Sequence, residues 1–376
     1  MDDTLNFCAV CLFGLEGLLG EELDAMGCKR TETINGRVFF TAPREYVARV
    51  NIRSRYAERI YIVLGSFMAE SFDALFEGTR ALPWEEFIRK DDRFPVTGHA
   101  IQSKLYSVPD CQSIVKKAII ERLKKFYPLS VFPETGPTVR AESFILRDKA
   151  WLMIDTSGTP LHKRGYRPET VAAPLRETLA AALAKLARPR HDVLFWDPFC
   201  GSGTIPIEAA MIMTNRAPGL MRKFAAQDAK YLPGGVWRDA FEEARSEIKT
   251  DAVFEACASD IDPECVRIAR ESAERAGVGD YVKTFVANAL DIETGGRRGT
   301  IVCNPPYGER LLDRKRCEEL YKAMGENWKR LGKWQIYVLS SHEGFERLYG
   351  RRADKVRKVY NGMIECYYYQ YFKNKN

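Results

Sequence analysis

The chain has 376 residues, about two to three times the size of a common domain, so we expect more than one domain. Hydrophobic residues make up 45% of it and aromatic residues 11%, a globular composition that excludes wholesale disorder. The 57 Lys and Arg residues exceed the 51 Asp and Glu residues by six, and Lys104 to Pro168, the cationic segment, alone holds 12 basic and 6 acidic residues. A local cationic surface favours a polyanionic partner.

The first part of the chain is expected to form two small α/β units and a linker. Residues 1–60 begin with an apolar strand and an amphipathic helix, and Asn35-Gly36 marks a hairpin. Residues 61–156 repeat this alternation and include a basic helix at 110–126. Residues 157–170 are polar and contain Gly and Pro, as linkers do. The expected strands are 5–12, two around 35–36, 59–67, 94–101, 138–146 and 151–155, and further helices are 15–26 and 44–53.

Residues 171–376 alternate helices and strands, which predicts a mostly parallel sheet with helices on both faces. Asn361-Gly362 stands between two alternating runs and predicts a final hairpin with an antiparallel strand. The fold class is therefore α/β, with five parallel strands and this hairpin in one seven-stranded sheet. The expected strands are 193–196, 253–259, 282–286, 300–303, 335–340, 355–360 and 363–371.

The segment Phe195–Ile205 has the pattern of a ligand-binding turn between a strand and a helix. Its strand ends at Asp197, Gly201 and Gly203 form the turn, and a helix follows. Glycines let a ligand approach the backbone, and a helix N-terminus favours an anion. The dinucleotide fingerprint fails because its sixth position is proline, while Asp197 suits a cation. S-adenosylmethionine (SAM) fits, since it has a carboxylate, an ammonium and a sulfonium; the alternative is a purely structural glycine turn.

Two more polar segments follow strands of the same expected sheet. Asp260 ends the next strand, where an acid can accept both ribose hydroxyl groups, and Asp262 is placed to cap the following helix. Asn288, after the third strand, is where an adenine edge could be met. Parallel strands end at one edge of a sheet, so these groups are expected around one nucleoside ligand.

The segment Asn304-Pro305-Pro306-Tyr307 also follows a strand. Its prolines remove two backbone donors and stiffen the chain, leaving carbonyl acceptors and the Asn amide. Such a loop can accept hydrogen bonds from an exocyclic amine and direct its lone pair at an electrophilic methyl group, while the tyrosine ring stacks on the base. A generic Pro-Pro turn is the alternative.

These strings together resemble a known family. Asp197–Thr204 with Asn304–Tyr307 resembles class I SAM-dependent methyltransferases that modify amino groups. Residues 161–167, 173–177 and 197–209 are similar to the THUMP-domain RNA guanine-N2 methyltransferases, particularly the bacterial enzymes for large-subunit ribosomal RNA. The resemblance implies a ferredoxin-like domain (1–60), a THUMP domain that binds RNA (61–156), a linker and a Rossmann-like catalytic domain (171–376).

The resemblance also implies roles for single residues. One departure is Asn288, because many relatives of the fold have Asp at this position; an Asn carbonyl can still accept the adenine amino group. We assign to catalysis Asn304, Pro305, Pro306 and Tyr307, and to the SAM site Asp197, Phe199, Gly201, Gly203, Thr204, Asp260, Ile261 and Asn288.

The basic residues of the cationic segment fit an RNA partner. A basic helix and the string from His162 to Arg167 combine cations with an aromatic ring, which suits phosphate contact and stacking on unpaired bases. A solvated charged face is the alternative. We assign to RNA binding Lys116, Lys117, Lys124, Lys125, His162, Lys163, Arg164, Tyr166 and Arg167.

Several alternatives stay open at this point. The target is a guanine of ribosomal RNA, as naked RNA or a particle; a transfer RNA guanine; or adenine N6 in DNA, which the missing helix-turn-helix pattern disfavours. A ribosome-assembly factor that binds RNA without catalysis is the non-enzymatic alternative. Ten scattered cysteines with one C-x-x-C pair, and four separated histidines, predict no metal site and a reduced, cytoplasmic protein. No apolar run is long enough for a membrane span.

Overall fold

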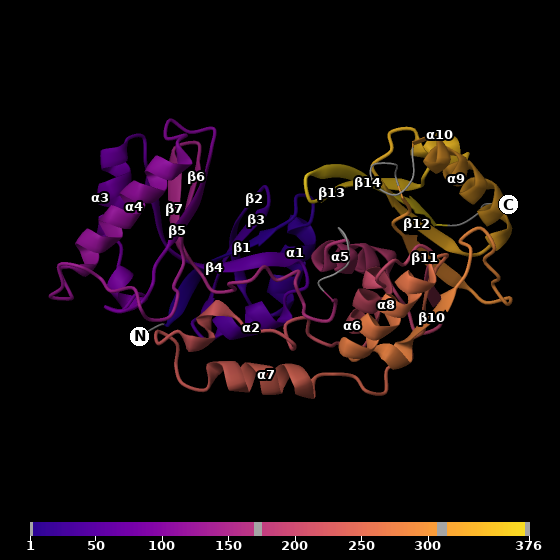
Figure 1. Cartoon of the computed structure of the whole chain (residues 1–376), viewed down its shortest axis with the longest axis horizontal. Helices are drawn as coiled ribbons and strands as arrows, with labels where there is room; N and C mark the ends of the chain where they lie inside the picture. Colours follow the sequence, from indigo (N-terminus) through magenta and orange to yellow (C-terminus); the bar gives the residue numbers. More distant parts are fainter. Residues whose placement is uncertain (1–2, 169–174, 307–313, 373–376) are drawn as a thin grey trace. The chain divides into compact units, whose positions relative to one another are not determined.

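The computed structural model describes residues 3–168, 175–306 and 314–372. The chain divides into two compact units, each built on a seven-stranded sheet (Figure 1). The first unit contains residues 1–11, 19–161 and 223–243, and the second contains residues 12–18, 162–222 and 244–376.

The sheet of the first unit is continuous, in the order β2-β3-β1-β4-β7-β6-β5. Its middle strand β4 pairs with β1 through its first half and with β7 along most of its length, with a bulge between Val63 and Gly65. The N-terminal residues and the residues after 61 therefore share one hydrogen-bonded sheet. Its strands are β1 (Thr4–Cys11), β2 (Lys29–Ile34), β3 (Arg37–Pro43), β4 (Ala57–Met68), β5 (Val96–Ile101), β6 (Ala141–Leu146) and β7 (Lys149–Asp155).

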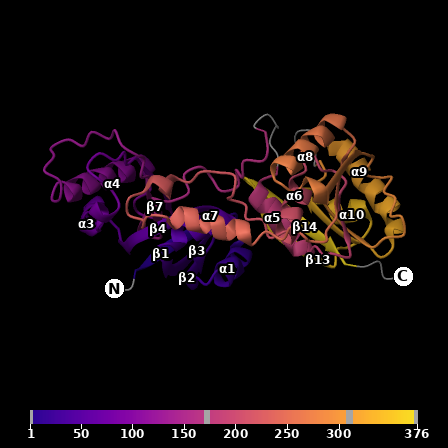
Figure 2. The same cartoon turned by 90° about the horizontal axis from the view of Figure 1, so that it is seen from below.

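Helices of the first unit connect these strands as the periodicity predicts. Helices α3 and α4 pack against each other and lie side by side in both views (Figures 1 and 2). The basic helix α4 spans 108–123 rather than 110–126. The β6–β7 turn uses Arg147 and Asp148, both with positive φ, one residue earlier than expected. The helices are α1 (Glu16–Ala25), α2 (Tyr46–Arg53), α3 (Phe72–Ala81), η1 (Trp84–Glu86) and α4 (Val108–Leu123).

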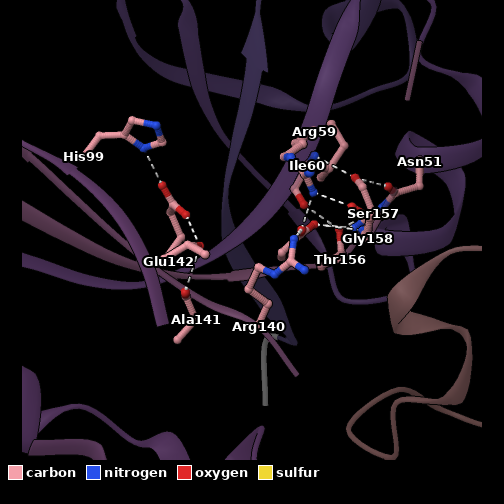
Figure 3. Close-up of polar contacts among 12 residues, drawn as sticks. Asn51, Arg59, Ile60, His99, Arg140, Ala141, Glu142, Thr156, Ser157 and Gly158 are labelled. Carbon is pink, nitrogen blue, oxygen red and sulfur yellow. Dashed lines mark hydrogen bonds and ion pairs between the residues drawn. The ribbon is translucent and has the colours of Figure 1, made fainter. Parts of the chain in front are cut away.

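A buried polar network surrounds the end of β7, a few residues before the chain passes from the first unit to the second (Figure 3). Asn51 donates to the Thr156 hydroxyl at 2.8 Å and accepts from the Ser157 hydroxyl at 2.6 Å. Arg59 pairs with the buried carboxylate of Asp155, although burial still raises the pKa of that carboxyl. The residues after Asp155 are thus fixed to α2 and β4 rather than extended into solvent.

Residues 223–243 belong to the first unit, which no sequence pattern indicated. They contain η2 (Ala225–Asp228) and most of α7 (Val236–Ser246). Glu243 forms an ion pair with Arg49 at 2.9 Å, and the Tyr231 ring lies 5.2 Å from the Phe87 ring. A segment that sequence analysis placed in the catalytic domain is therefore part of the other unit's fold.

The second unit has the predicted sheet, in the order β10-β9-β8-β11-β12-β14-β13. The first five of these strands are parallel, and β14 pairs antiparallel with β12 and β13, which confirms the expected architecture. The hairpin loop is Gly362-Met363, because Asn361 already pairs with Ile364. The strands are β8 (Leu194–Asp197), β9 (Ala256–Asp260), β10 (Val282–Val286), β11 (Gly299–Cys303), β12 (Gln335–Ser340), β13 (Lys355–Asn361) and β14 (Ile364–Tyr371).

Both faces of this second sheet are covered. One face packs on α9, η4 and α10 through a core that includes Trp196, Tyr321 and Trp328. Helices α5, α6 and α8 contact other parts of the strands, and Tyr368 donates to a carbonyl of α5. Within the described residues, no helix is long and apolar enough to cross a membrane. The helices are α5 (Glu177–Ala187), α6 (Thr204–Met213), α8 (Pro263–Arg275), η3 (Gly279–Tyr281), α9 (Arg314–Asn327), η4 (Trp328–Leu331) and α10 (Phe345–Tyr349).

Candidate active site

The candidate site lies at the carboxyl ends of four neighbouring parallel strands, β10, β9, β8 and β11. Asp197 and Asp260 are the last residues of β8 and β9, and Asn304 directly follows β11. Asn288 follows β10 by two residues. The strand order therefore brings the predicted polar residues to one edge of the sheet, where open α/β sheets bind ligands.

The two glycines after β8 have different functions. Both have positive φ, 49° at Gly201 and 78° at Gly203, a conformation that favours glycine. A Cβ atom added at Gly203 would lie 2.9 Å from the Cβ of Ala269, so this glycine permits packing against α8. A Cβ added at Gly201 would meet nothing within 4 Å. Gly201 is thus the position at which a ligand can approach the backbone.

The two aspartates hold the loop between them. Asp197 is 2% exposed and accepts the Phe199 N–H at 3.0 Å; burial, and to a smaller extent the nearby Asp260, raises its pKa well above the usual range. Asp260 accepts the Gly201 N–H at 2.9 Å and the Asp262 N–H at 3.1 Å. Asp260 therefore anchors the glycine turn, a contact that the sequence did not indicate, and each carboxylate oxygen keeps acceptor capacity for a ligand.

Other polar and apolar residues around the cofactor site differ in how much of their bonding capacity the chain already uses. Asp262 caps α8 by accepting the Glu264 N–H at 2.9 Å, which confirms the predicted cap. Ile261 is 73% exposed and offers an apolar surface beside Asp260. The Oδ1 atom of Asn288 accepts the Leu290 N–H at 3.1 Å. One acceptor position of that oxygen is therefore already used by the chain.

The side chain of Asn304 carries a hydrogen-bond acceptor that no described residue uses. Its Oδ1 atom is buried, and among the described residues nothing donates a hydrogen bond to it. Native proteins rarely leave a buried acceptor unpaired, so this atom is a candidate for a bond to a ligand. Pro305 is buried, and Tyr307 lies outside the described residues. Cys303 is fully buried, and burial raises the pKa of its thiol well above the usual range.

Two aromatic residues that the sequence did not indicate donate hydrogen bonds to backbone carbonyls of the loops that follow β10 and β11. The Tyr321 hydroxyl donates to the carbonyl of Pro306 at 2.9 Å. The Trp328 indole donates to the carbonyl of Ala289 at 2.9 Å, and its ring lies 6.5 Å from the Phe199 ring. Helical periodicity indicates that both are core residues, but no local signal shows that their polar atoms reach loops 15 and 39 residues away.

The structure corrects three of the RNA-binding assignments. Arg164 and Tyr166 are 2% and 1% exposed and both contact Glu208, so neither can reach a phosphate or a base from this position. Arg167 is 13% exposed and pairs with Glu177 at 2.9 Å. The reason is that buried carboxylates already take up these polar groups: Glu208 contacts Arg164 and Tyr166, and Glu177 pairs with Arg167.

The remaining RNA-binding assignments are two paired lysines, one half-buried histidine and three exposed lysines. Lys116 pairs with Glu134, and Lys124 pairs with Glu121 at 2.9 Å. His162 is half-buried. Three assigned lysines are exposed and form no ion pair with any described residue: Lys117, Lys125 and Lys163.

A cavity of about 470 Å³ lies in the first unit rather than at the strand ends. Its walls include Phe87, Tyr127, Asp155 and Tyr231. Within the described part of the chain, no group of three or more His, Cys, Asp or Glu residues is placed to hold a metal ion.

Comparison with known proteins identifies the family. The family described as "RMKL-like, methyltransferase domain" matches residues 164–370, which is more than half of the chain. The chain belongs to this RMKL-like methyltransferase family. The first unit matches an RlmL ferredoxin-like domain at residues 6–61 and a THUMP domain at residues 69–155. The ferredoxin-like, THUMP and methyltransferase organisation expected from the sequence motifs is thereby confirmed.

Relatives of this RMKL-like methyltransferase carry related names. YpsC of Bacillus subtilis, which is named an RNA methyltransferase, is 44% identical, and the match covers 97% of this chain and 95% of YpsC. The ribosomal RNA large subunit methyltransferase K/L of Syntrophotalea carbinolica is 34% identical over 97% of this chain but only 53% of that protein. The chain therefore spans about half the length of the K/L proteins that it matches.

Solved structures match the whole fold. The protein SMU.472, complexed with SAH, has a TM-score of 0.93 and 39% identity, with all of each chain covered. A protein of Listeria monocytogenes named an N6-adenine-specific DNA methylase has a TM-score of 0.93 and 43% identity, with 98% of this chain and 96% of that chain covered. These names agree on methyl transfer and differ on the nucleic acid.

Proposed function

We propose that this chain is a SAM-dependent RNA methyltransferase that acts on the exocyclic N2 of a guanine, in large-subunit ribosomal RNA. The observation that carries the proposal is the buried Oδ1 atom of Asn304, which has no hydrogen-bond partner among the described residues. It lies at the tip of β11, and β11 neighbours β8, whose tip carries the open turn at Gly201. An acceptor for an amine thus lies beside a site for the methyl donor.

The residues at the tips of β8 and β9 fit SAM. Gly201 leaves space at the backbone, the N-terminus of α6 favours a carboxylate, and Asp197 and Asp260 offer acceptors to ammonium and ribose hydroxyl groups. SAH, the product of methyl transfer from SAM, is present in the structure of SMU.472. When bound, SAM supplies an electrophilic methyl group and leaves as SAH once its carbon–sulfur bond breaks.

The chain's own residues orient the amine rather than activate it covalently. A guanine amine is a weak nucleophile, because its lone pair is delocalised into the ring. Asn304 Oδ1 can accept one of its N–H groups and turn the lone pair toward the methyl carbon, so a nitrogen–carbon bond forms and a proton passes from nitrogen to water. Cys303 is buried and holds its proton, which does not suit a covalent intermediate.

Three observations support RNA as the substrate class. The first unit matches a THUMP domain and an RlmL ferredoxin-like domain, and relatives are named ribosomal RNA methyltransferases. The exposed Lys117 on α4 and the exposed Lys125 just after it can contact phosphates. Guanine N2 follows from the resemblance of residues 161–167 and 197–209 to that enzyme group. Adenine N6 in DNA is the second candidate, since the Asn-Pro-Pro turn suits any exocyclic amine and the Listeria relative carries that name.

The test is methyl transfer with identification of the product nucleoside. The purified chain is incubated with radiolabelled SAM and, separately, with naked 23S RNA, large ribosomal subunits, transfer RNA and DNA, all from a strain lacking the gene. We expect label in 23S RNA or its particle and N2-methylguanosine in the mass spectrum. Label in DNA with N6-methyladenine would replace the proposal by the second candidate, and no transfer to any substrate would refute both.

A further inference from the structure

Two arginines and two glutamates lie around the start of α6, and all of them are buried except Arg167, whose side chain is 13% exposed. Arg164 contacts Glu208 at 3.5 Å, and Arg167 pairs with Glu177 at 2.9 Å. The side chains of the two glutamates are at most 3% exposed. Burying ionised groups is costly unless each is matched, so this cluster needs a reason beyond packing. Its position next to the glycine turn provides one.

The glycine turn is held from two sides. On one side β9 fixes its first half, because Ser259 O accepts the Cys200 N–H at 3.0 Å and Asp260 accepts the Gly201 N–H. On the other side the hydroxyl group of Thr204, the first residue of α6, lies 3.1 Å from the Ser202 hydroxyl and accepts a hydrogen bond from Arg167 Nη1 at 3.2 Å. Thr204 is 4% exposed, so its hydroxyl group is used by the protein itself.

Arg167 joins three segments through one planar group. The same Nη1 atom donates to Leu175 O at 3.1 Å, and Nη2 pairs with Glu177 at the start of α5. A guanidinium presents several donors in a fixed plane, whereas a lysine ammonium is a single flexible point and cannot span the same acceptors. The residue therefore ties the segment after residue 161 to the starts of α5 and α6.

We propose that Arg167 is a positioning residue of the cofactor site, which sets the second half of the glycine turn through the Thr204 hydroxyl group. This inference rests on the proposed function, because it assumes that the turn binds SAM. It also replaces the RNA contact that the sequence suggested for this residue. Arg167 acts on cofactor affinity, not on the RNA.

The test measures SAH binding by calorimetry in two conservative variants. Thr204→Val removes the hydroxyl group that accepts from Arg167, and Arg167→Lys keeps the positive charge but loses the planar guanidinium with its several donors. We expect each to weaken SAH binding about tenfold, as loss of a hydrogen bond to a charged group does. The double variant should be no weaker than the worse single variant, because both remove one shared contact. Thr204→Ser keeps the hydroxyl group and should bind SAH as the wild type does.

Tyr166→Phe is the matched control. It removes the buried hydrogen bond of 3.0 Å to Glu208, in the same cluster, without touching the turn. We expect a lower temperature of unfolding but unchanged SAH affinity. When the SAM concentration is varied at saturating RNA, the loss in Arg167→Lys should appear in the KM for SAM more than in kcat.

The outcomes separate this inference from the proposed function. If the wild-type protein does not bind SAH, the proposed function itself fails. If the wild type binds and Thr204→Val binds equally well, or if Tyr166→Phe is weakened as much, the positioning role is wrong. Should Arg167→Lys not fold, the pair Thr204→Val and Thr204→Ser still decides.

Discussion

Asn304, at a strand tip of the second unit, and the paired cations of the cationic segment differ in whether the fold already uses their polar groups. At the tip of β11, Asn304 Oδ1 is buried without a partner among the described residues, and Gly201 leaves open space. In the cationic segment, by contrast, Arg164 and Arg167 are matched by buried glutamates and Lys116 by Glu134. A candidate binding group is therefore one whose bonding capacity is unused at a place that a ligand can approach; an unpartnered buried atom alone is not enough, because Glu177 Oε2 and Glu208 Oε2 also lack partners among the described residues.

The largest effect tests this rule at two asparagines. Asn304→Ala should lower the single-turnover rate of methyl transfer by ~10²-fold or more, the scale of losing one positioned polar group. Asn288→Ala is the control, because its Oδ1 already accepts the Leu290 N–H and less of it is free. SAH and RNA affinities of Asn304→Ala should change by only a few-fold. A rate near that of the wild type would remove Asn304 from the reaction.

The second effect compares exposed with paired lysines on α4 and in the two residues that follow it. Lys117→Gln with Lys125→Gln should weaken RNA binding by about tenfold near 0.1 M salt and flatten its salt dependence, because fewer counterions are released. Lys116→Gln with Lys124→Gln removes the same charge from residues that already have carboxylate partners, and should do less. RNA titrations over a range of salt concentrations measure both. Equal slopes for the two variants would contradict the comparison.

A smaller effect concerns the support behind the catalytic turn. Tyr321→Phe frees the carbonyl of Pro306, and the looser turn should transfer methyl groups about three- to tenfold more slowly. Tyr368→Phe loses a similar bond, to a carbonyl of α5, and should reduce stability without slowing the reaction. Single-turnover rates and thermal unfolding of both variants give the answer. An equal rate for the two would mean that the Tyr321 hydroxyl serves packing alone.

The smallest effect is a pH dependence at Asp197. Burial raises the pKa of its carboxyl, which favours the protonated form, whereas a cationic ligand favours the carboxylate. SAM binding should therefore release a proton, and SAM affinity should increase a few-fold as pH increases through the raised pKa. SAH, which lacks the sulfonium charge, should respond less. Calorimetry in buffers of different ionisation enthalpy measures the proton; an unchanged release in Asp197→Asn would assign it elsewhere.

The sequence predicts the strand tips well for a physical reason. Alternating helices and strands force a parallel sheet, and parallel strands end at one edge, so Asp197, Asp260 and Asn304 meet without any knowledge of packing. The roles assigned to them remain predictions until the variants are measured. The turn at Gly201 could also be predicted, because glycine marks positions where the backbone takes a positive φ.

Charge partners could not be predicted in the same way. Glu208, which neutralises Arg164, is 44 residues further along the chain, and local sequence does not indicate such a distant pairing. From the sequence alone, His162 to Arg167 looks like an exposed basic patch, because nothing there shows that Glu208 of α6 contacts Arg164 and Tyr166. Tyr321 and residues 223–243 were missed for the same reason, since their contacts depend on the tertiary fold.

The return of residues 223–243 to the first unit has a consequence for synthesis on the ribosome. Domains usually fold in order as the chain emerges, N-terminal part first. Here the first unit lacks its packing around Tyr231 and Glu243 until residue 243 has been made, by which time β8 and α6 of the second unit already exist. The first unit therefore completes its packing only after part of the second unit has been synthesised, and a nascent chain stopped before residue 223 would expose Phe87, the apolar partner of Tyr231, to solvent and to chaperones.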